Sequence, residues 1–134
     1  MSHEFACKVY YEDTDLAGVV YYANYLKFIE RARTEALREA GVDQRALLRE
    51  TGVVFVVRRV EIDYIAPARF QDAILVRTST ERVSGARAVL LQEVCRGEDT
   101  LARAHVQVAA MGNDGRPARI PSPARAALEA FANG

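Results

Sequence analysis

The sequence has no excess charge of one sign and no long apolar run, and both absences exclude classes of protein. Its 134 residues include 18 basic and 18 acidic side chains, so the positive excess typical of nucleic-acid-binding surfaces is missing. No apolar stretch approaches the roughly 20 residues that a membrane-spanning helix needs. No basic start followed by an apolar run marks a signal peptide. We therefore expect a cytoplasmic protein that neither binds nucleic acid nor spans a membrane.

Cysteine is scarce as well. The two cysteines, Cys7 and Cys95, lie far apart in the sequence and match no metal-binding spacing. The simplest interpretation is that both are small buried hydrophobic residues in a reducing compartment. Neither a metal-ligand cluster nor a serine-centred nucleophile elbow is visible. We therefore expect a protein that needs no metal and no cofactor.

The composition is that of an ordinary globular domain. Half of the residues are hydrophobic and 27% are charged, which is typical neither of disordered nor of membrane proteins. A chain of this length buries roughly two-thirds of the surface that its unfolded form exposes, which is enough for one core. The sequence contains no internal repeat, linker or low-complexity tract, and it predicts a single domain over residues 1–134.

One long helix is predicted in the first half of the sequence. Apolar residues recur every three or four positions from Tyr22 to Ala40, as on one face of a helix, and Gly41 is a natural stop signal. The pattern predicts about 19 helical residues, or roughly 28 Å at 1.5 Å per residue. The expected buried face consists of Tyr22, Leu26, Ile29, Ala32 or Arg33, Ala36, Leu37 and Ala40.

The remaining elements are mostly strands. β-Branched and aromatic residues predict a first strand at 4–11, and a short helix is expected at 43–50. Four more strands, separated by turn signals, are predicted at 53–66, 72–83, 86–96 and 100–111. A short amphipathic helix follows Pro121. One long helix and a run of strands favour an α+β fold, with an antiparallel five-stranded sheet against which the helix lies.

The most informative segment is the acidic loop before the long helix. Glu12, Asp13 and Asp15 place three carboxylates within four positions. Aspartates favour the positive end of a helix dipole, but the helix is expected to begin about six residues later, so this effect explains them poorly. The residues alone leave open whether the segment is a solvated acidic loop or a functional site.

A carboxylate at this place has suitable neighbours for acyl transfer. Such chemistry needs a nucleophile or base beside a carbonyl carbon, and donors that face the developing oxyanion. The first turn of a helix offers free backbone N–H groups and a positive dipole end. Gly18 either lets the loop turn or lets a ligand approach closely.

The same segment resembles a known family. From Tyr10 to Leu37, the sequence is similar to the signature of the YbgC-like and 4-hydroxybenzoyl-CoA thioesterases of the hotdog superfamily. The matching pieces are Tyr11-Glu12-Asp13-Thr14-Asp15, Gly18-Val19-Val20-Tyr21, Asn24-Tyr25, Glu30-Arg31-Ala32-Arg33-Thr34-Glu35, Phe55-Val56-Val57-Arg58-Arg59 and Tyr64-Ile65-Ala66-Pro67-Ala68-Arg69. The resemblance extends over nearly the whole chain. It implies a hotdog fold, in which an antiparallel sheet wraps around one long central helix.

The resemblance also implies roles for individual residues. Asp15 matches the family's catalytic carboxylate, and Tyr22 matches the residue whose backbone N–H polarises the thioester carbonyl at the helix start. Gly18, Val19 and Tyr25 fall in the matching substrate-binding segment. The implied reaction is hydrolysis of an acyl-CoA to a free acid and coenzyme A, which is part of the substrate. The carboxylate would either attack the carbonyl or activate water.

Position 22 departs from one branch of the family. It is commonly histidine in YbgC-like proteins, whereas it is tyrosine here, as in the hydroxybenzoyl branch. The change is compatible with catalysis because the donor is a main-chain group. A tyrosine side chain that lines the pocket would favour short or aromatic acyl groups.

Three arginines are candidates for binding the phosphates of coenzyme A. Arg58 and Arg59 lie in a predicted strand, where the alternative is a solvated pair with one residue on each face. Arg87 is the basic residue that this chain keeps in a loop that is richly basic in the hydroxybenzoyl branch. The chain has two histidines and neither is in a hydratase motif, which disfavours a hotdog dehydratase. His105 is expected to pack or to lie at the surface.

The resemblance further implies partners and an alternative function. Hotdog proteins form dimers that join their sheets and often pair into tetramers, so we expect a homodimer or a homotetramer. YbgC-like proteins are linked to the Tol-Pal system and to acyl carrier protein. The alternative is therefore a non-catalytic module that binds acyl-CoA or acyl carrier protein, or a partner of an envelope complex, on the same fold. An intact Asp15 favours the enzyme.

Overall fold

The computed structural model describes residues 2–132, and its central element is the helix α1, Asn24–Glu39. Gly41 follows the helix with φ 92°, so the predicted stop signal is confirmed. The face that packs on the sheet consists of Tyr25, Phe28, Ile29, Ala32 and Ala36. These residues are spaced three or four apart and therefore form one apolar stripe along the helix.

The predicted start of the helix is wrong, and its predicted buried face is only partly right: Ile29, Ala32 and Ala36 are buried as expected. Tyr22 and Ala23 form a turn before the first helical residue. Tyr22 is 62% exposed and Leu26 is 40% exposed, although both were predicted to be buried. Two neighbouring apolar stripes run along this segment, and periodicity alone does not decide which of them faces the sheet. The sheet covers the stripe that begins at Tyr25.

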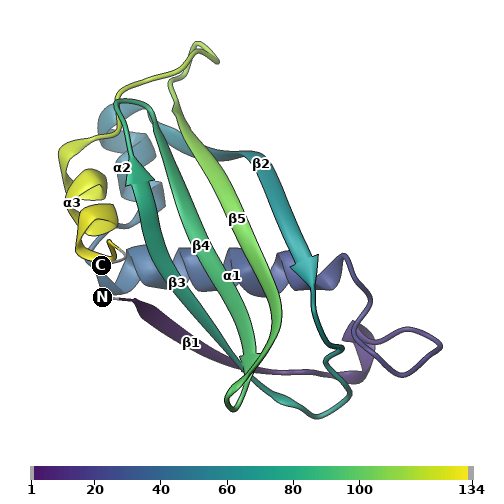
Figure 1. The fold of residues 1–134 in the computed structure, drawn as a ribbon. Coiled ribbons are helices and arrows are strands. Elements are labelled where there is room, and N and C mark those ends of the chain that lie inside the picture. The colour runs from purple at the N-terminus through teal and green to yellow at the C-terminus, as the bar shows by residue number, and fades with distance from the viewer. Residues whose placement is uncertain (1, 133–134) are drawn as a thin grey trace.

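Five strands form one antiparallel sheet in the order β1-β3-β4-β5-β2 (Figure 1). Their bounds are β1 His3–Lys8, β2 Val54–Tyr64, β3 Ala73–Val83, β4 Arg87–Arg96 and β5 Asp99–Met111. The predicted α+β class and five-stranded antiparallel sheet are therefore confirmed. The first strand ends at Lys8 and not at residue 11, because the next residues turn into a short 3₁₀ helix, η1, Tyr11–Asp13.

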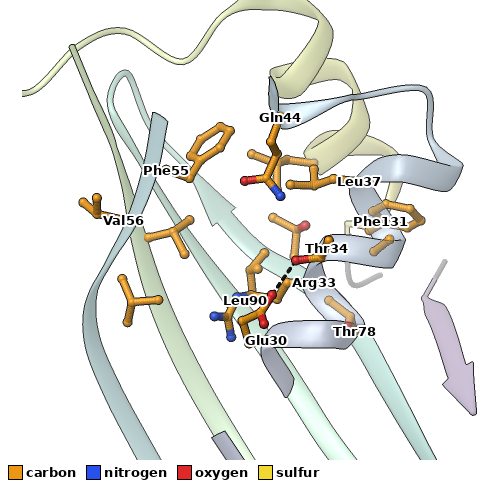
Figure 2. Close-up of a pocket in the computed structure, with 15 residues that line it drawn as sticks. Glu30, Arg33, Thr34, Leu37, Gln44, Phe55, Val56, Thr78, Leu90 and Phe131 are labelled. Carbon is orange, nitrogen blue, oxygen red and sulfur yellow. Dashed lines mark hydrogen bonds between the residues drawn. The ribbon is translucent and has the colours of Figure 1, made fainter. Parts of the chain in front are cut away.

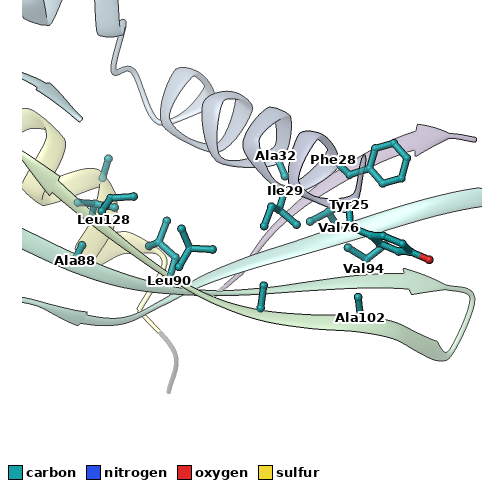
Figure 3. Packing of buried hydrophobic residues seen from close by; sticks show 14 of the residues in the cluster. Tyr25, Phe28, Ile29, Ala32, Val76, Ala88, Leu90, Val94, Ala102 and Leu128 are labelled. Carbon is teal, nitrogen blue, oxygen red and sulfur yellow. The ribbon is translucent and has the colours of Figure 1, made fainter. Parts of the chain in front are cut away.

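The sheet curves around α1. Neighbouring strands shift register between Val57 and Arg59, between Thr80 and Arg82, and between Val94 and Cys95. Such β-bulges bend a strand and increase its twist. The helix lies across the concave face, where its buried stripe meets apolar side chains of the sheet (Figures 1 and 3).

One polar side chain joins the helix to the sheet inside this core. Gln92 of β4 is wholly buried. Its Nε2 donates to the carbonyl of Ile29 and to Thr78 Oγ1, both at 2.9 Å, and its Oε1 accepts from Arg33 Nη1 at 3.0 Å. A buried amide without partners would destabilise the fold. The bonds of Gln92 therefore help to fix the position of α1 on the sheet.

The two ends of α1 have different surroundings. The short helices α2, Gln44–Thr51, and α3, Ser122–Ala130, lie near its C-terminal end, whereas the acidic loop lies at its N-terminal end (Figure 1). Both short helices agree with the prediction from the sequence. Within residues 2–132, no helix is long and apolar enough to cross a membrane. Cys95 is buried, as expected, but Cys7 is only partly buried.

Candidate active site

Asp13 holds the acidic loop against the start of α1. Its Oδ2 accepts the Tyr10 N–H at 2.8 Å. Its carbonyl accepts the Tyr21 N–H at 2.9 Å and the side-chain amide of Asn24 at 3.0 Å. Asp13 is 8% exposed. These contacts show that Asp13 orders the loop, so its acidity has a structural explanation.

Residues 14–20 double back as a narrow hairpin with Asp15 at its base. The Asp15 N–H donates to the carbonyl of Val19 at 2.9 Å, and the Gly18 N–H donates to the carbonyl of Asp15 at 3.0 Å. The hairpin tip is closed by the Ala17 N–H, which donates to Asp15 Oδ1 at 2.9 Å. Gly18 has φ 79°, and a Cβ added there would meet nothing within 4 Å. The backbone of the turn is therefore what requires glycine at this position.

Asp15 keeps one carboxylate oxygen for other partners. The residue is exposed, and Oδ1 is engaged by the Ala17 N–H. Among the residues that the structure describes, Oδ2 accepts no hydrogen bond. The bond to Oδ1 holds the carboxylate in place within its own turn. The other oxygen is available to contact a ligand.

The turn before α1 supplies a free backbone donor. Within residues 2–132, the Tyr22 N–H has no hydrogen-bond partner, although its neighbour Tyr21 donates to Asp13. The carbonyl of Tyr22 accepts the Tyr64 hydroxyl at 2.9 Å. Burial, and then the neighbouring Tyr22 and Tyr25, raise the pKa of Tyr64. The phenol therefore stays protonated and orients the backbone at Tyr22.

Asp15 and Tyr22 line the same open pocket, which has a volume of about 370 Å³. This lies within the range of roughly 300–1,000 Å³ that is common for small-molecule sites. A residue with a free carboxylate oxygen and a residue with an unpaired backbone N–H thus line one cavity, and attack on a carbonyl requires groups of these two kinds. The other lining residues are Val19, Val20, Tyr21, Tyr25, Tyr64, Ile65, Ala66 and Pro67.

Aromatic rings form much of the wall of this pocket. The rings of Tyr21 and Tyr22 lie 5.0 Å apart, and Tyr64 contacts Tyr25 at 5.3 Å and Tyr22 at 6.2 Å between ring centroids. Residues 64–67 were not predicted to reach the pocket. In the sequence they were marked only as part of the family motif at 64–69. That the end of β2 lies close to the acidic loop follows from the tertiary fold and is not visible in the sequence.

The predicted substrate-binding residues are only partly gathered here. Val19 and Tyr25 line the pocket with Asp15, and Gly18 shapes the adjoining turn. Tyr25 is 3% exposed and its hydroxyl accepts the Ala68 N–H at 3.0 Å, so most of this side chain belongs to the core.

The three arginines lie away from this pocket within one protomer. Arg58 lies at an irregularity of β2, where the pairing with β5 skips from Val57 to Arg59. Arg59 pairs with Glu61 at 2.8 Å and lines a hollow on the outer face of the sheet. Arg87 lines an adjoining hollow at the start of β4, and the two hollows share Arg82, Val89 and Gln107. On the same outer face, His105 Nδ1 lies 2.6 Å from Glu81 Oε1, which agrees with a surface role. Binding of phosphates by the arginines stays a prediction.

Comparisons with known proteins agree with this fold. The model of the thioesterase superfamily matches residues 17–103. The chain is 42% identical to the acyl-CoA thioesterase YbgC of Haemophilus influenzae, over 92% of both chains. Among solved structures, it resembles a probable thioesterase from Bartonella henselae, with a TM-score of 0.86 and 38% identity over 90% of this chain and 100% of that one. It also resembles a 1,4-dihydroxy-2-naphthoyl-CoA thioesterase from Synechocystis, with a TM-score of 0.88 and 25% identity over 96% of each chain.

The hotdog fold, the matched family model and the similar thioesterases together define the class of this protein as a thioesterase. The chain belongs to the thioesterase superfamily, and within it to the YbgC-like family.

The contacts of Asp13 lead to a prediction about stability. Replacing Asp13 by Ala should lower the free energy of unfolding by about 1–3 kcal/mol, because the Tyr10 N–H then loses its partner in a partly buried place. Urea denaturation at a fixed protein concentration measures this change. The control is Glu12→Ala, an exposed carboxylate one position away, which should shift stability by less than about 0.5 kcal/mol. Equal losses in the two variants would contradict the role given to Asp13.

Proposed function

We propose that this protein hydrolyses an acyl-CoA thioester to a free acid and coenzyme A, with Asp15 and the Tyr22 N–H as its catalytic groups. The observation that supports this most directly is that Asp15 and Tyr22 line one pocket. The relative from Haemophilus influenzae, an acyl-CoA thioesterase, supports the reaction class. In this proposal no metal and no cofactor take part, since coenzyme A is part of the substrate.

The chemistry follows from where charge develops during thioester cleavage. As the carbonyl carbon becomes tetrahedral, its oxygen gains negative charge, which an unpaired backbone N–H stabilises by a hydrogen bond. The Tyr22 N–H is such a donor, and it needs no other bond to be broken first. Asp15 either attacks the carbon and forms an anhydride with the acyl group, or takes a proton from an attacking water.

The exposed walls of the pocket support an assembly larger than one chain. Tyr22 is 62% exposed, Ile65 is 54% exposed and Tyr64 is 45% exposed, although apolar surface of this extent is usually covered by a partner or a ligand. The edge strand β2 also presents Val56 and Val57 to solvent. A second copy would cover such surfaces and would bring another set of arginines towards the substrate. Coenzyme A phosphates would then meet Arg58, Arg59 or Arg87 of either subunit.

The first test is Asp15→Asn. The amide keeps an oxygen that can accept the Ala17 N–H, so the turn and the fold should survive. Without the negative charge, the side chain can neither attack the thioester nor accept a proton, and a general base contributes about 10²–10⁴-fold. We expect kcat for a hydrolysed acyl-CoA to fall by at least about 10²-fold, with little change in substrate binding.

The matched control is Asp13→Asn, which alters the neighbouring carboxylate that orders the loop and should lose far less turnover. Near-normal activity of folded Asp15→Asn, with an unchanged circular dichroism spectrum, would remove Asp15 from the mechanism. It would also favour the alternative of a non-catalytic module that binds acyl-CoA or acyl carrier protein, or a Tol-Pal envelope partner. Single-turnover hydrolysis in ¹⁸O-water addresses the route, because label in the aspartate carboxylate requires an anhydride.

A second prediction concerns the acyl group. The aromatic wall and the volume of about 370 Å³ suit a short or aromatic acyl group, since aromatic rings pack edge-to-face against one another. We expect kcat/KM for benzoyl-CoA or butyryl-CoA to exceed that for palmitoyl-CoA by at least about tenfold. A thiol-release assay across these three substrates measures the ratio. A clear preference for palmitoyl-CoA would refute this specificity.

A third prediction concerns assembly. We expect a homodimer or a homotetramer in which β2 edges are joined, so light scattering should give at least twice the chain mass of 14.9 kDa. Val57→Lys places a charge on the exposed edge and should weaken the assembly, whereas Leu48→Lys on the exposed part of α2 should not. A stable monomer of the unaltered protein at micromolar concentration would exclude this arrangement.

A further inference from the structure

A second hollow lies between the C-terminal half of α1 and the inner face of the sheet (Figure 2). Its volume is about 230 Å³, and it shares no lining residue with the Asp15 pocket. From Tyr22 to Arg33 the chain advances roughly 16 Å along the helix axis, so the hollow lies well beyond the helix start. Most of its wall is apolar and comes from α1, β2, β4 and β5, with Leu37, Phe55, Leu90 and Val108 among the lining residues.

A cationic side chain without a carboxylate partner lies in this apolar wall. Arg33 is half-buried, and within residues 2–132 it forms no ion pair. Its Nη1 donates to Gln92 Oε1 at 3.0 Å, which leaves the other donors of the guanidinium available. Because Gln92 is itself fixed by Ile29 and Thr78, it holds Arg33 in place. Burial lowers the pKa of Arg33, and the neighbouring Glu30 opposes this shift.

A buried hydroxyl without a partner lines the same hollow. Thr80 is 3% exposed, and its Oγ1 makes no hydrogen bond in the part of the chain that the structure describes. A buried hydroxyl in this state is costly, and native proteins rarely leave one unpaired. Its neighbour on the strand, Thr78, is not in this state, because its Oγ1 accepts from Gln92. The hydroxyl exposes almost no surface to the hollow in this rotamer, and rotation about the Cα–Cβ bond would turn the unmatched donor towards a ligand atom there.

We propose that this hollow binds a small monocarboxylic acid with an apolar tail. The carboxylate would accept hydrogen bonds from Arg33 and from the Thr80 hydroxyl, and the tail would pack against Phe55 and Leu90. The volume is below the usual range for drug-sized ligands, so the hollow suits a short acid and excludes coenzyme A. This site does not depend on the reaction at Asp15.

Glu30 provides a second test of the proposal, because it places a negative charge at the same hollow. Its Oε2 accepts the Thr34 hydroxyl at 2.6 Å, and the residue is exposed (Figure 2). A carboxylate ligand would be repelled by Glu30 and attracted by Arg33. Removal of the two charges should therefore change its affinity in opposite directions.

The probe is sodium hexanoate, titrated into full-length Asp15→Asn protein and followed by methyl NMR. We expect the methyl signals of Leu90 and Val108 to shift on binding. Affinity should fall at least about tenfold in Arg33→Gln and in Thr80→Val, and should rise in Glu30→Gln. The neutral analogue 1-hexanol should bind more weakly than hexanoate to the Asp15→Asn protein. Its affinity should be the same whether or not Glu30→Gln is added, because it carries no charge for Glu30 to repel.

Thr80→Val is the decisive variant because it keeps the shape of the side chain and removes only the unpaired hydroxyl. It should be at least as stable as the unaltered protein in urea, and it should hydrolyse acyl-CoA at an unchanged rate. If Arg33→Gln does not fold, Thr80→Val and Glu30→Gln still decide the question. Absence of hexanoate-induced shifts at these methyl groups at millimolar concentration, or binding that neither variant alters, would overturn the proposal.

Discussion

The hydrogen bonds around Asp13 are the constraint on which the candidate active site depends. Its carbonyl receives both the Tyr21 N–H and the Asn24 amide, and its carboxylate receives the Tyr10 N–H. A largely buried carboxylate is tolerated in this loop because it is hydrogen-bonded, whereas a buried polar group without a partner is costly. The loop is thereby bonded to the helix start at Tyr21 and at Asn24. These bonds fix the residues from which the hairpin with Asp15 extends.

With the loop fixed, the proposed mechanism draws on the main chain as well as on Asp15. The proposed oxyanion donor is a backbone N–H, so its position follows from the turn at Tyr22 and Ala23 and not from the identity of the side chain. Tyr22 and Ala23 lie in a turn because α1 begins only at Asn24, two residues later than its apolar pattern predicts. The side chain at position 22 is then free to shape the wall of the pocket, where it packs against its aromatic neighbours in tilted and edge-to-face contacts. In the proposed mechanism, catalysis and substrate choice thus depend on different atoms of one residue.

Local patterns in the sequence predicted most of the fold, and tertiary contacts decided the rest. The later strands were found because their alternating residues are separated by clear turns, such as Ser84-Gly85. The first turns of the buried helix face were predicted wrongly, because Tyr22 and Leu26 are as apolar as the residues that pack on the sheet. Family resemblance identified Asp15 and Tyr22, which line one pocket. It gave no role to Tyr64, because the sequence does not show that the end of β2 meets the helix start.

Both hollows are built on the segment that contains α1. Tyr22, in the turn before the helix, lines one hollow, and Arg33, in the second half of the helix, lines the other. Gln92 holds this second half on the sheet, because its Oε1 accepts from Arg33 and its Nε2 donates to the carbonyl of Ile29. A carboxylate bound as proposed would use the remaining donors of the Arg33 guanidinium and would leave the bond to Gln92 in place. The proposed acid site and the proposed reaction at Asp15 therefore need different atoms of the segment, although both rely on the same fixed helix.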